Sequence, residues 1–187
     1  GKPSGKVAST QWHSDKSFRP QPSLATILHA LVMPPEGGET CFANMIAAYE
    51  ALPEAEKAEL DGVRVVHSWE ISQARAGFKA PPEEIADAPP MAHPLVRTIP
   101  ETGRKALFMG ERAVFFEGQP EEAGRARLEK LTAHAVQDRF VYRHKWTMGD
   151  LLMWDNRCLL HRAGTNFDAA RFPRVLQRTC LRGAAPA

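Results

Sequence analysis

The sequence has few cysteines, no excess of charge of one sign and no long apolar run. Its 187 residues include three cysteines, which stand far apart and form no C-x-x-C pair. This sparse, odd number argues against a disulfide framework and favours a reducing, cytoplasmic setting. The formal net charge is only +2, so we expect neither nucleic acid nor a membrane as partner. No stretch approaches the roughly 20 apolar residues that span a bilayer, and the polar start has no signal-peptide core.

The remaining composition is that of an ordinary globular domain, with 43% hydrophobic and 25% charged residues. The length predicts a single domain over residues 1–187. Apolar or alternating runs predict strands over 23–33, 40–43, 63–69, 141–146, 151–154 and 174–181, and a hairpin over 95–109. Helical spacing predicts helices over 45–60, split at Pro53, and over 121–140. This mostly β pattern with flanking helices indicates a sandwich, jelly roll or barrel.

Residues 70–90 show neither the strand nor the helix period and are rich in Ala, Pro and Glu. A connection of this length inside a compact domain is usually a binding loop or a disordered insertion. We expect a lid loop here, with a surface insertion as the equal alternative.

An imidazole and a carboxylate stand two residues apart in Trp12-His13-Ser14-Asp15. On an extended backbone such residues point to the same face, so both can reach one ion. A second imidazole, His161, follows the apolar run 151–154 near the other end of the chain. Two histidines and one carboxylate form the facial triad of non-haem Fe(II) oxygenases, which leaves positions open for a keto acid and O₂. The pattern predicts His13, Asp15 and His161 as the catalytic metal ligands.

A lone H-x-D also occurs by chance, and the chain has histidines to spare. We expect the other five to be core, surface or supporting residues: His29, His67, His93, His134 and His144. The same ligand types also bind Zn²⁺, so a zinc hydrolase is an alternative.

Two arginines on the last predicted strand favour an anion site. Arg174 and Arg178 share one strand face, and guanidinium groups bind carboxylates through a rigid fork. An iron-bound 2-oxoglutarate needs such a partner at its far carboxylate, and Thr40 can add a hydroxyl donor. The alternative is an exposed basic strand without function.

With these residues in view, the chain resembles the taurine dioxygenase family, which includes the 2,4-dichlorophenoxyacetate dioxygenases. The matching segments run in the family's order from about residue 11 to 183: WHSD (12–15), GGET (37–40), AAYEAL (47–52), HPLVRT (93–98), PETGRKALF (100–108), WDNR (154–157), HRA (161–163) and PR (173–174). The resemblance implies a double-stranded β-helix, or jelly roll, with Fe(II) near one open end.

The resemblance also implies a role for each candidate residue. His13, Asp15 and His161 are the iron ligands, and Trp154 packs beside the metal histidine. Thr40 and Arg174 hold the distal carboxylate of 2-oxoglutarate, with Arg171 as a weaker candidate for that arginine. Arg178 is similar to the family's second arginine, which lies near the 2-oxoglutarate and the substrate's acid group.

The implied activity is that of an Fe(II)- and 2-oxoglutarate-dependent dioxygenase that uses O₂ and releases succinate and CO₂. The substrate is expected to be a small organic anion: a sulfonate, a sulfate ester, or an aryloxy or other carboxylate. We also expect the chain to form a homo-oligomer. A jelly-roll protein that binds a metal or a small acid without turnover is the alternative from another class.

Two features depart from the family. Arg112 and Ala113 stand where the taurine enzymes have an aromatic residue, which disfavours taurine itself. Only twelve residues precede His13, so we expect a chain that lacks the family's N-terminal part, either as a fragment or as a shortened protein.

Overall fold

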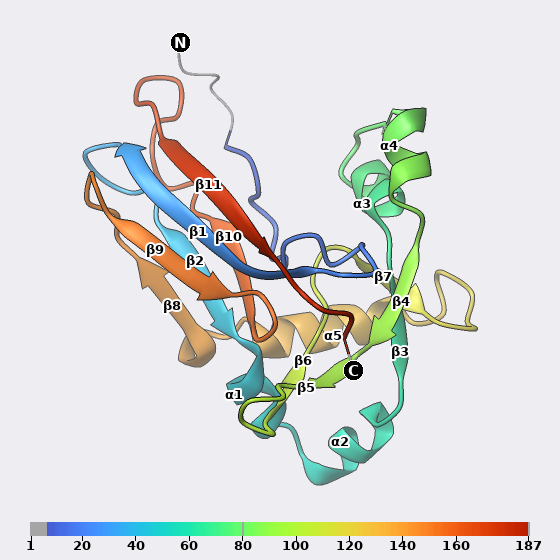
Figure 1. Cartoon of the computed structure of the whole chain (residues 1–187). Helices are drawn as coiled ribbons and strands as arrows, with labels where there is room; N and C mark the ends of the chain where they lie inside the picture. The colour runs from blue at the N-terminus through green and yellow to red at the C-terminus, as the bar shows by residue number, and fades with distance from the viewer. Residues whose placement is uncertain (1–6, 80, 187) are drawn as a thin grey trace.

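Two three-stranded antiparallel sheets lie one over the other on one side of the molecule (Figure 1). This computed structural model describes residues 7–79 and 81–186; the first six residues of the polar start, Ala80 of the predicted lid and Ala187 lie outside it. The first sheet has the order β11–β1–β9, formed by Ser23–Val32 (β1), Leu151–Asp155 (β9) and Val175–Arg182 (β11). The second has the order β10–β2–β8, formed by Thr40–Asn44 (β2), Val141–His144 (β8) and Leu159–Ala163 (β10).

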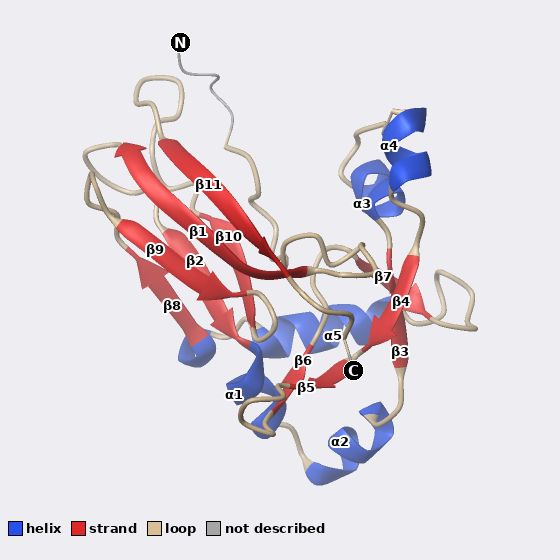
Figure 2. Ribbon diagram, viewed as in Figure 1, coloured by secondary structure: helices blue, strands red, loops and turns tan. Residues whose placement is uncertain are grey.

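A third, smaller sheet lies on the other side of the molecule, with two short helices beyond it (Figure 2). Its order is β4–β3–β7, formed by Arg64–His67 (β3), Met91–Pro94 (β4) and Ala113–Phe116 (β7). The hairpin of β5 (Val96–Thr98) and β6 (Lys105–Leu107) connects this sheet to the rest. The two helices beyond the sheet are α3 (Trp69–Arg75) and α4 (Pro82–Asp87).

Helices α1 (Met45–Glu50), α2 (Glu54–Leu60) and α5 (Arg125–Ala135) flank the hairpin and close the main core. Helix α1 begins where the Asn44 side chain accepts hydrogen bonds from the backbone N–H groups of Ile46 and Ala47. Its buried residues Met45 and Ala48 pack with Leu128 and Leu131 of α5. The core therefore supports the ends of β2 and β10, the strands nearest the predicted metal histidine.

The strand predictions are largely confirmed, and three strands were missed. Strands β1, β2, β3, β8, β9 and β11, the β5–β6 hairpin and the break at Pro53 lie close to the predicted positions. The missed strands β4, β7 and β10 have four or five residues each, with no clear alternation. The predicted helix over 121–140 is wrong in extent, because α5 ends at Ala135 and a 3₁₀ turn, Asp138–Phe140, follows.

Residues 70–90 contain α3 and α4 where an irregular connection was expected. The Ser68 side chain caps α3 by accepting from the Ile71 N–H, and Pro82 begins α4 directly after Pro81. These capping and proline positions allow both helices to form although the apolar residues in this segment show little helical spacing. In the described parts of the chain, all three cysteines are free, as expected, and no helix is long and apolar enough to cross a membrane.

Core truncation should destabilise the fold strongly. Leu95 is fully buried among the core residues, so Leu95→Ala is expected to lower the free energy of unfolding by about 2–5 kcal/mol, measured by urea denaturation. Leu151 is 71% exposed, and Leu151→Ala should change it by less than about 0.5 kcal/mol. Equal losses in the two variants would show that this cluster is not the core.

Candidate metal centre and anion pocket

His13 and His161 face each other through two backbone hydrogen bonds. The His13 N–H donates to the His161 carbonyl at 3.0 Å, and the His161 N–H donates to the His13 carbonyl at 2.8 Å. Residues paired in this way project their side chains to the same side. The ring centroids are accordingly 4.2 Å apart. A segment near the start of the chain thus becomes a partner of β10.

Asp15 completes a three-residue cluster with these histidines. His13 Nε2 lies 3.8 Å from Asp15 Oδ1, and His161 Nε2 lies 3.6 Å from Asp15 Oδ2. One ligand atom from each residue lies within 4.8 Å of the other two, and all three residues are buried. Of the described residues, no other group of histidine, cysteine and acidic side chains has this arrangement.

The protonation of the cluster suits a cation. His13 Nδ1 donates to the Gln11 carbonyl at 2.8 Å, and this bond turns Nε2 toward Asp15. Burial, followed by the neighbouring His13, lowers the pKa of His161 to about 3, so this imidazole is neutral. Burial alone would raise the pKa of Asp15, but His161 and the Thr26 hydroxyl outweigh it, and the pKa is lowered. Two imidazoles and one carboxylate are the donor set that suits Fe(II).

A buried hydrogen-bond network orients Asp15. Thr26 on β1 donates its hydroxyl to Asp15 Oδ2 at 2.6 Å, and Asn156 Nδ2 donates to the Thr26 oxygen at 2.8 Å. Asn156 Oδ1 accepts from the Asp15 backbone N–H and from Trp154 Nε1, each at 3.2 Å. Trp154 also packs against the His161 ring at a centroid distance of 4.7 Å.

No role for Thr26 or Asn156 was predicted from the sequence. Asn156 lies in the WDNR segment (154–157), two positions after Trp154, and its place in this family-like segment was the signal that could have identified it. Thr26 is one of several polar residues on β1, and nothing in the sequence distinguishes it.

A cavity of about 570 Å³ lies between the two large sheets beside the metal cluster. Its lining includes His13 and His161 together with Thr40, Arg174 and Arg178. Arg174 Nε donates to the Gly38 carbonyl at 2.8 Å, and Arg174 Nη2 donates to Thr40 Oγ1 at 3.0 Å. Burial lowers the pKa of Arg174, and the described residues place no carboxylate in an ion pair with it. The cavity is therefore lined by a half-buried guanidinium, that of Arg174, with no acidic partner among the described residues.

The Gly37-Gly38 turn permits this placement of Arg174. Both glycines have positive φ, at 74° and 70°. A Cβ at Gly37 would lie 2.3 Å from the Asn166 carbonyl oxygen, and one at Gly38 would lie 3.3 Å from Arg174 Cδ. The Asn166 side chain accepts from the Gly38 N–H at 3.1 Å, which fixes the turn against the loop that leads to Arg174. Only glycine fits this approach.

The other two candidate arginines lie differently. Arg178 Nη1 is 3.4 Å from Asp15 Oδ1, and its side chain is 56% exposed, so it lies at the open side of the metal cluster. Arg171 is exposed and stacks on Phe172. In the described part of the chain, its guanidinium hydrogen-bonds to neither Thr40 nor Gly38. The geometry thus groups Arg174, and not Arg171, with Thr40.

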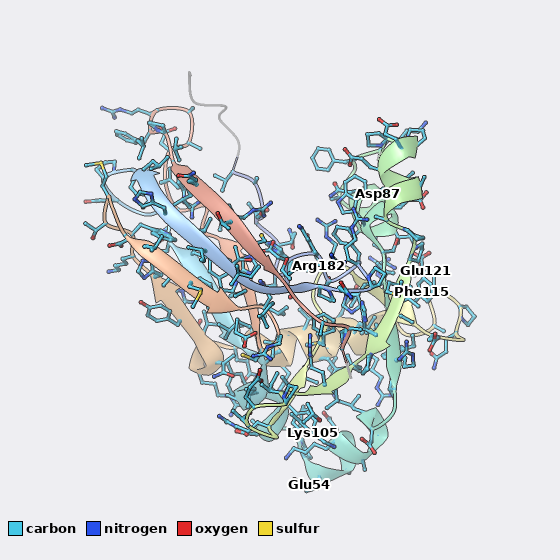
Figure 3. The ribbon with its side chains drawn as sticks, viewed as in Figure 1. Glu54, Asp87, Lys105, Phe115, Glu121 and Arg182 are labelled. Carbon is cyan, nitrogen blue, oxygen red and sulfur yellow. The ribbon has the colours of Figure 1, made fainter. Side chains whose placement is uncertain are left out.

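The helical segment 69–88 contacts Arg19, which follows the metal ligand Asp15 by four positions. Arg19 donates to both the backbone carbonyl and the carboxylate of Asp87, at the end of α4. The Arg19 carbonyl in turn contacts His93 Nε2 at 3.0 Å. Asp87 and Arg182, which Figure 3 labels, both line another cavity of about 640 Å³.

Loss of the Thr26 hydroxyl should weaken metal binding. Thr26→Val removes the donor to Asp15 and leaves the carboxylate less well oriented, so Fe(II) or Mn(II) affinity should fall by roughly 10- to 100-fold. Calorimetric titration with Mn(II) measures this change. The control is Thr132→Val, whose hydroxyl bonds the Leu128 carbonyl within α5 and not a residue of the cluster. Equal metal affinity in Thr26→Val and the unaltered protein would contradict the assigned role.

The sequence is similar to a known protein family and to several characterised dioxygenases. The model of the family described as taurine catabolism dioxygenase TauD, TfdA family matches residues 1–180. An alpha-ketoglutarate-dependent 2,4-dichlorophenoxyacetate dioxygenase from Burkholderia sp. (strain RASC) is 44% identical over 178 residues, or 95% of this chain and 60% of the relative. A (S)-phenoxypropionate/alpha-ketoglutarate-dioxygenase from Sphingobium herbicidovorans is 39% identical over 81% of this chain and 55% of its own length.

A solved structure agrees with the fold as well. The crystal structure of AAD-2 in complex with Mn(II) and N-oxalylglycine superimposes with a TM-score of 0.87 at 40% identity, covering 94% of this chain and 69% of that one. The chain spans about three fifths of the length of the first curated relatives that it matches. The family match over nearly its whole length shows that the chain belongs to the taurine catabolism dioxygenase TauD, TfdA family.

Proposed function

We propose that this chain carries the catalytic centre of an Fe(II)- and 2-oxoglutarate-dependent dioxygenase that hydroxylates a small organic anion. The observation that carries the proposal is the position of Arg174, which lines the same cavity as the His13–Asp15–His161 cluster and has no acidic partner among the described residues. A zinc hydrolase has no need of an unpaired guanidinium in the cavity beside its metal. The requirement for a keto acid with a second carboxylate explains it.

Each residue of the centre has one task. His13, Asp15 and His161 would hold the iron. The iron would supply the oxidative chemistry with O₂ and 2-oxoglutarate, which yields succinate and CO₂. Arg174 and Thr40 bind the distal carboxylate and so orient the keto acid. Asp15 is kept ionised and correctly turned by Thr26.

We further propose that the two large sheets are the two faces of a double-stranded β-helix. The cavity between them, the antiparallel pairing and the likeness to dioxygenase structures support this assignment. A lid role for residues 70–90, self-association into a homo-oligomer and a cytoplasmic location stay predictions.

Anaerobic addition of Fe(II) and 2-oxoglutarate should give a weak visible charge-transfer band, because the keto acid chelates the metal. His13→Ala should abolish the band, since it removes a ligand from the cluster. His29→Ala is the matched control, because His29 lies on β1 outside the cluster, and it should retain the band. A protein that binds zinc and shows no band with iron would contradict the proposed function.

Arg178 is proposed as the anchor of the substrate's acid group, because its guanidinium lies beside Asp15 and is open to solvent. Succinate release should be stimulated by an aryloxy acid, a sulfonate or a sulfate ester. Arg178→Gln should raise the KM of the active compound by roughly tenfold or more, as expected for loss of a charge-assisted hydrogen bond. Arg182→Gln, on the same strand but bonded to Gln21, is the control. Stimulation by none of the compounds would remove this substrate class.

A further inference from the structure

The Thr40 hydroxyl oxygen accepts two hydrogen bonds from different directions. One comes from Arg174 Nη2 at 3.0 Å, and the other comes from the indole Nε1 of Trp146, also at 3.0 Å. Both donors are obligate, because neither a guanidinium nor an indole N–H can accept. Thr40 is 3% exposed and lines the cavity beside the metal cluster.

These two contacts determine what the hydroxyl can offer a ligand. A threonine hydroxyl has two acceptor lone pairs and one proton. Arg174 and Trp146 occupy both lone pairs, so the only capacity left at Thr40 Oγ1 is donation of its own proton. Without the indole, the proton could turn toward either of two directions, and a lone pair could face the cavity. The Trp146 N–H therefore removes that freedom.

The sheet register explains how Trp146 reaches Thr40. Thr40 on β2 is paired with His144 on β8, so the two side chains lie on the same face of the sheet. Trp146 follows two positions after His144 and returns to that face. Its ring packs edge-on against His144 at 4.5 Å and 87°. His144 is itself held by Asp150 Oδ2 at 3.3 Å and by the Tyr142 hydroxyl at 3.2 Å.

Trp146 is not among the described residues that line the cavity. Trp146 can therefore affect a molecule in the cavity only through its hydrogen bond to Thr40. It is a positioning residue and does not contact the ligand itself. The indole N–H also has no role in the core, because the residue is only half-buried and its N–H is directed at the hydroxyl.

We propose that Trp146 fixes the Thr40 hydroxyl as an obligate proton donor to the distal carboxylate of 2-oxoglutarate. The inference rests on the proposed function and deepens it, since it names the residue that makes the pocket selective for a keto acid with a second carboxylate. A carboxylate offers only acceptors at neutral pH, which matches a site built from the free N–H groups of Arg174 and the oriented O–H of Thr40.

The test compares two keto acids on the iron-loaded protein. Trp146→Phe keeps the ring against His144 and removes only the N–H. Its dissociation constant for 2-oxoglutarate, read from the visible charge-transfer band under anaerobic conditions, should rise by roughly 3- to 10-fold, the value of one hydrogen bond. The dissociation constant for 2-oxobutyrate, which lacks the distal carboxylate, should not change. Calorimetry with Mn(II) and N-oxalylglycine gives a second readout without the iron.

A double-substitution series separates this role from general damage to the pocket. Thr40→Val removes the hydroxyl, so adding Trp146→Phe to it should cause no further loss of 2-oxoglutarate affinity. Unchanged 2-oxoglutarate affinity in Trp146→Phe, an equal loss for both keto acids, or full additivity with Thr40→Val would each overturn the inference. If the unaltered protein bound neither keto acid, the proposed function would fail and this inference with it, so the two failures are distinguishable.

Discussion

The pair of backbone hydrogen bonds between His13 and His161 is the contact on which the site depends. It brings a segment from the start of the chain onto β10 and sets the side chains of both histidines to one side. Because side chains alternate along a strand, a slip of one residue would turn both imidazoles away from each other. Gly110 contributes to this closeness, since a Cβ there would lie 2.9 Å from the Trp12 carbonyl oxygen. The metal cluster is thus a product of strand register.

The cavity next to this cluster contains a guanidinium, that of Arg174, which has no acidic partner among the described residues. Burying a guanidinium without a carboxylate costs free energy, which is recovered only when an anion binds. Arg174 is in this state, whereas surface arginines such as Arg104 bind a glutamate directly. The missing acidic partner distinguishes Arg174 from the arginines that form surface ion pairs. Next to Arg174 lies the Thr40 hydroxyl, which accepts a hydrogen bond from Trp146 and is thereby oriented.

Much of this arrangement could be predicted from short patterns, and some could not. The H-x-D pair, His161 and Arg174 were predicted from the two-residue spacing of His13 and Asp15 and from the resemblance of the surrounding segments to the family. The strand that was predicted to carry Arg174 begins one residue later, at Val175. Thr26 and Asn156 were not, because their role depends on contacts between β1 and the turn after β9, which no local pattern encodes. Strand β10 was missed although it carries a predicted ligand, since its five residues show no alternation. The helices within 69–88 were missed because capping, and not apolar spacing, defines them.

The site also has a consequence for how the protein is made. Ser14 and Asn156 hydrogen-bond across 142 positions, so the contacts that build the centre have very high contact order. During synthesis the first ligands leave the ribosome long before β10 and β11 exist, and no partial chain can assemble the three-residue cluster. A metal bound to His13, Asp15 and His161 would therefore stabilise the contact between these two distant segments, and its binding free energy would add to that of folding.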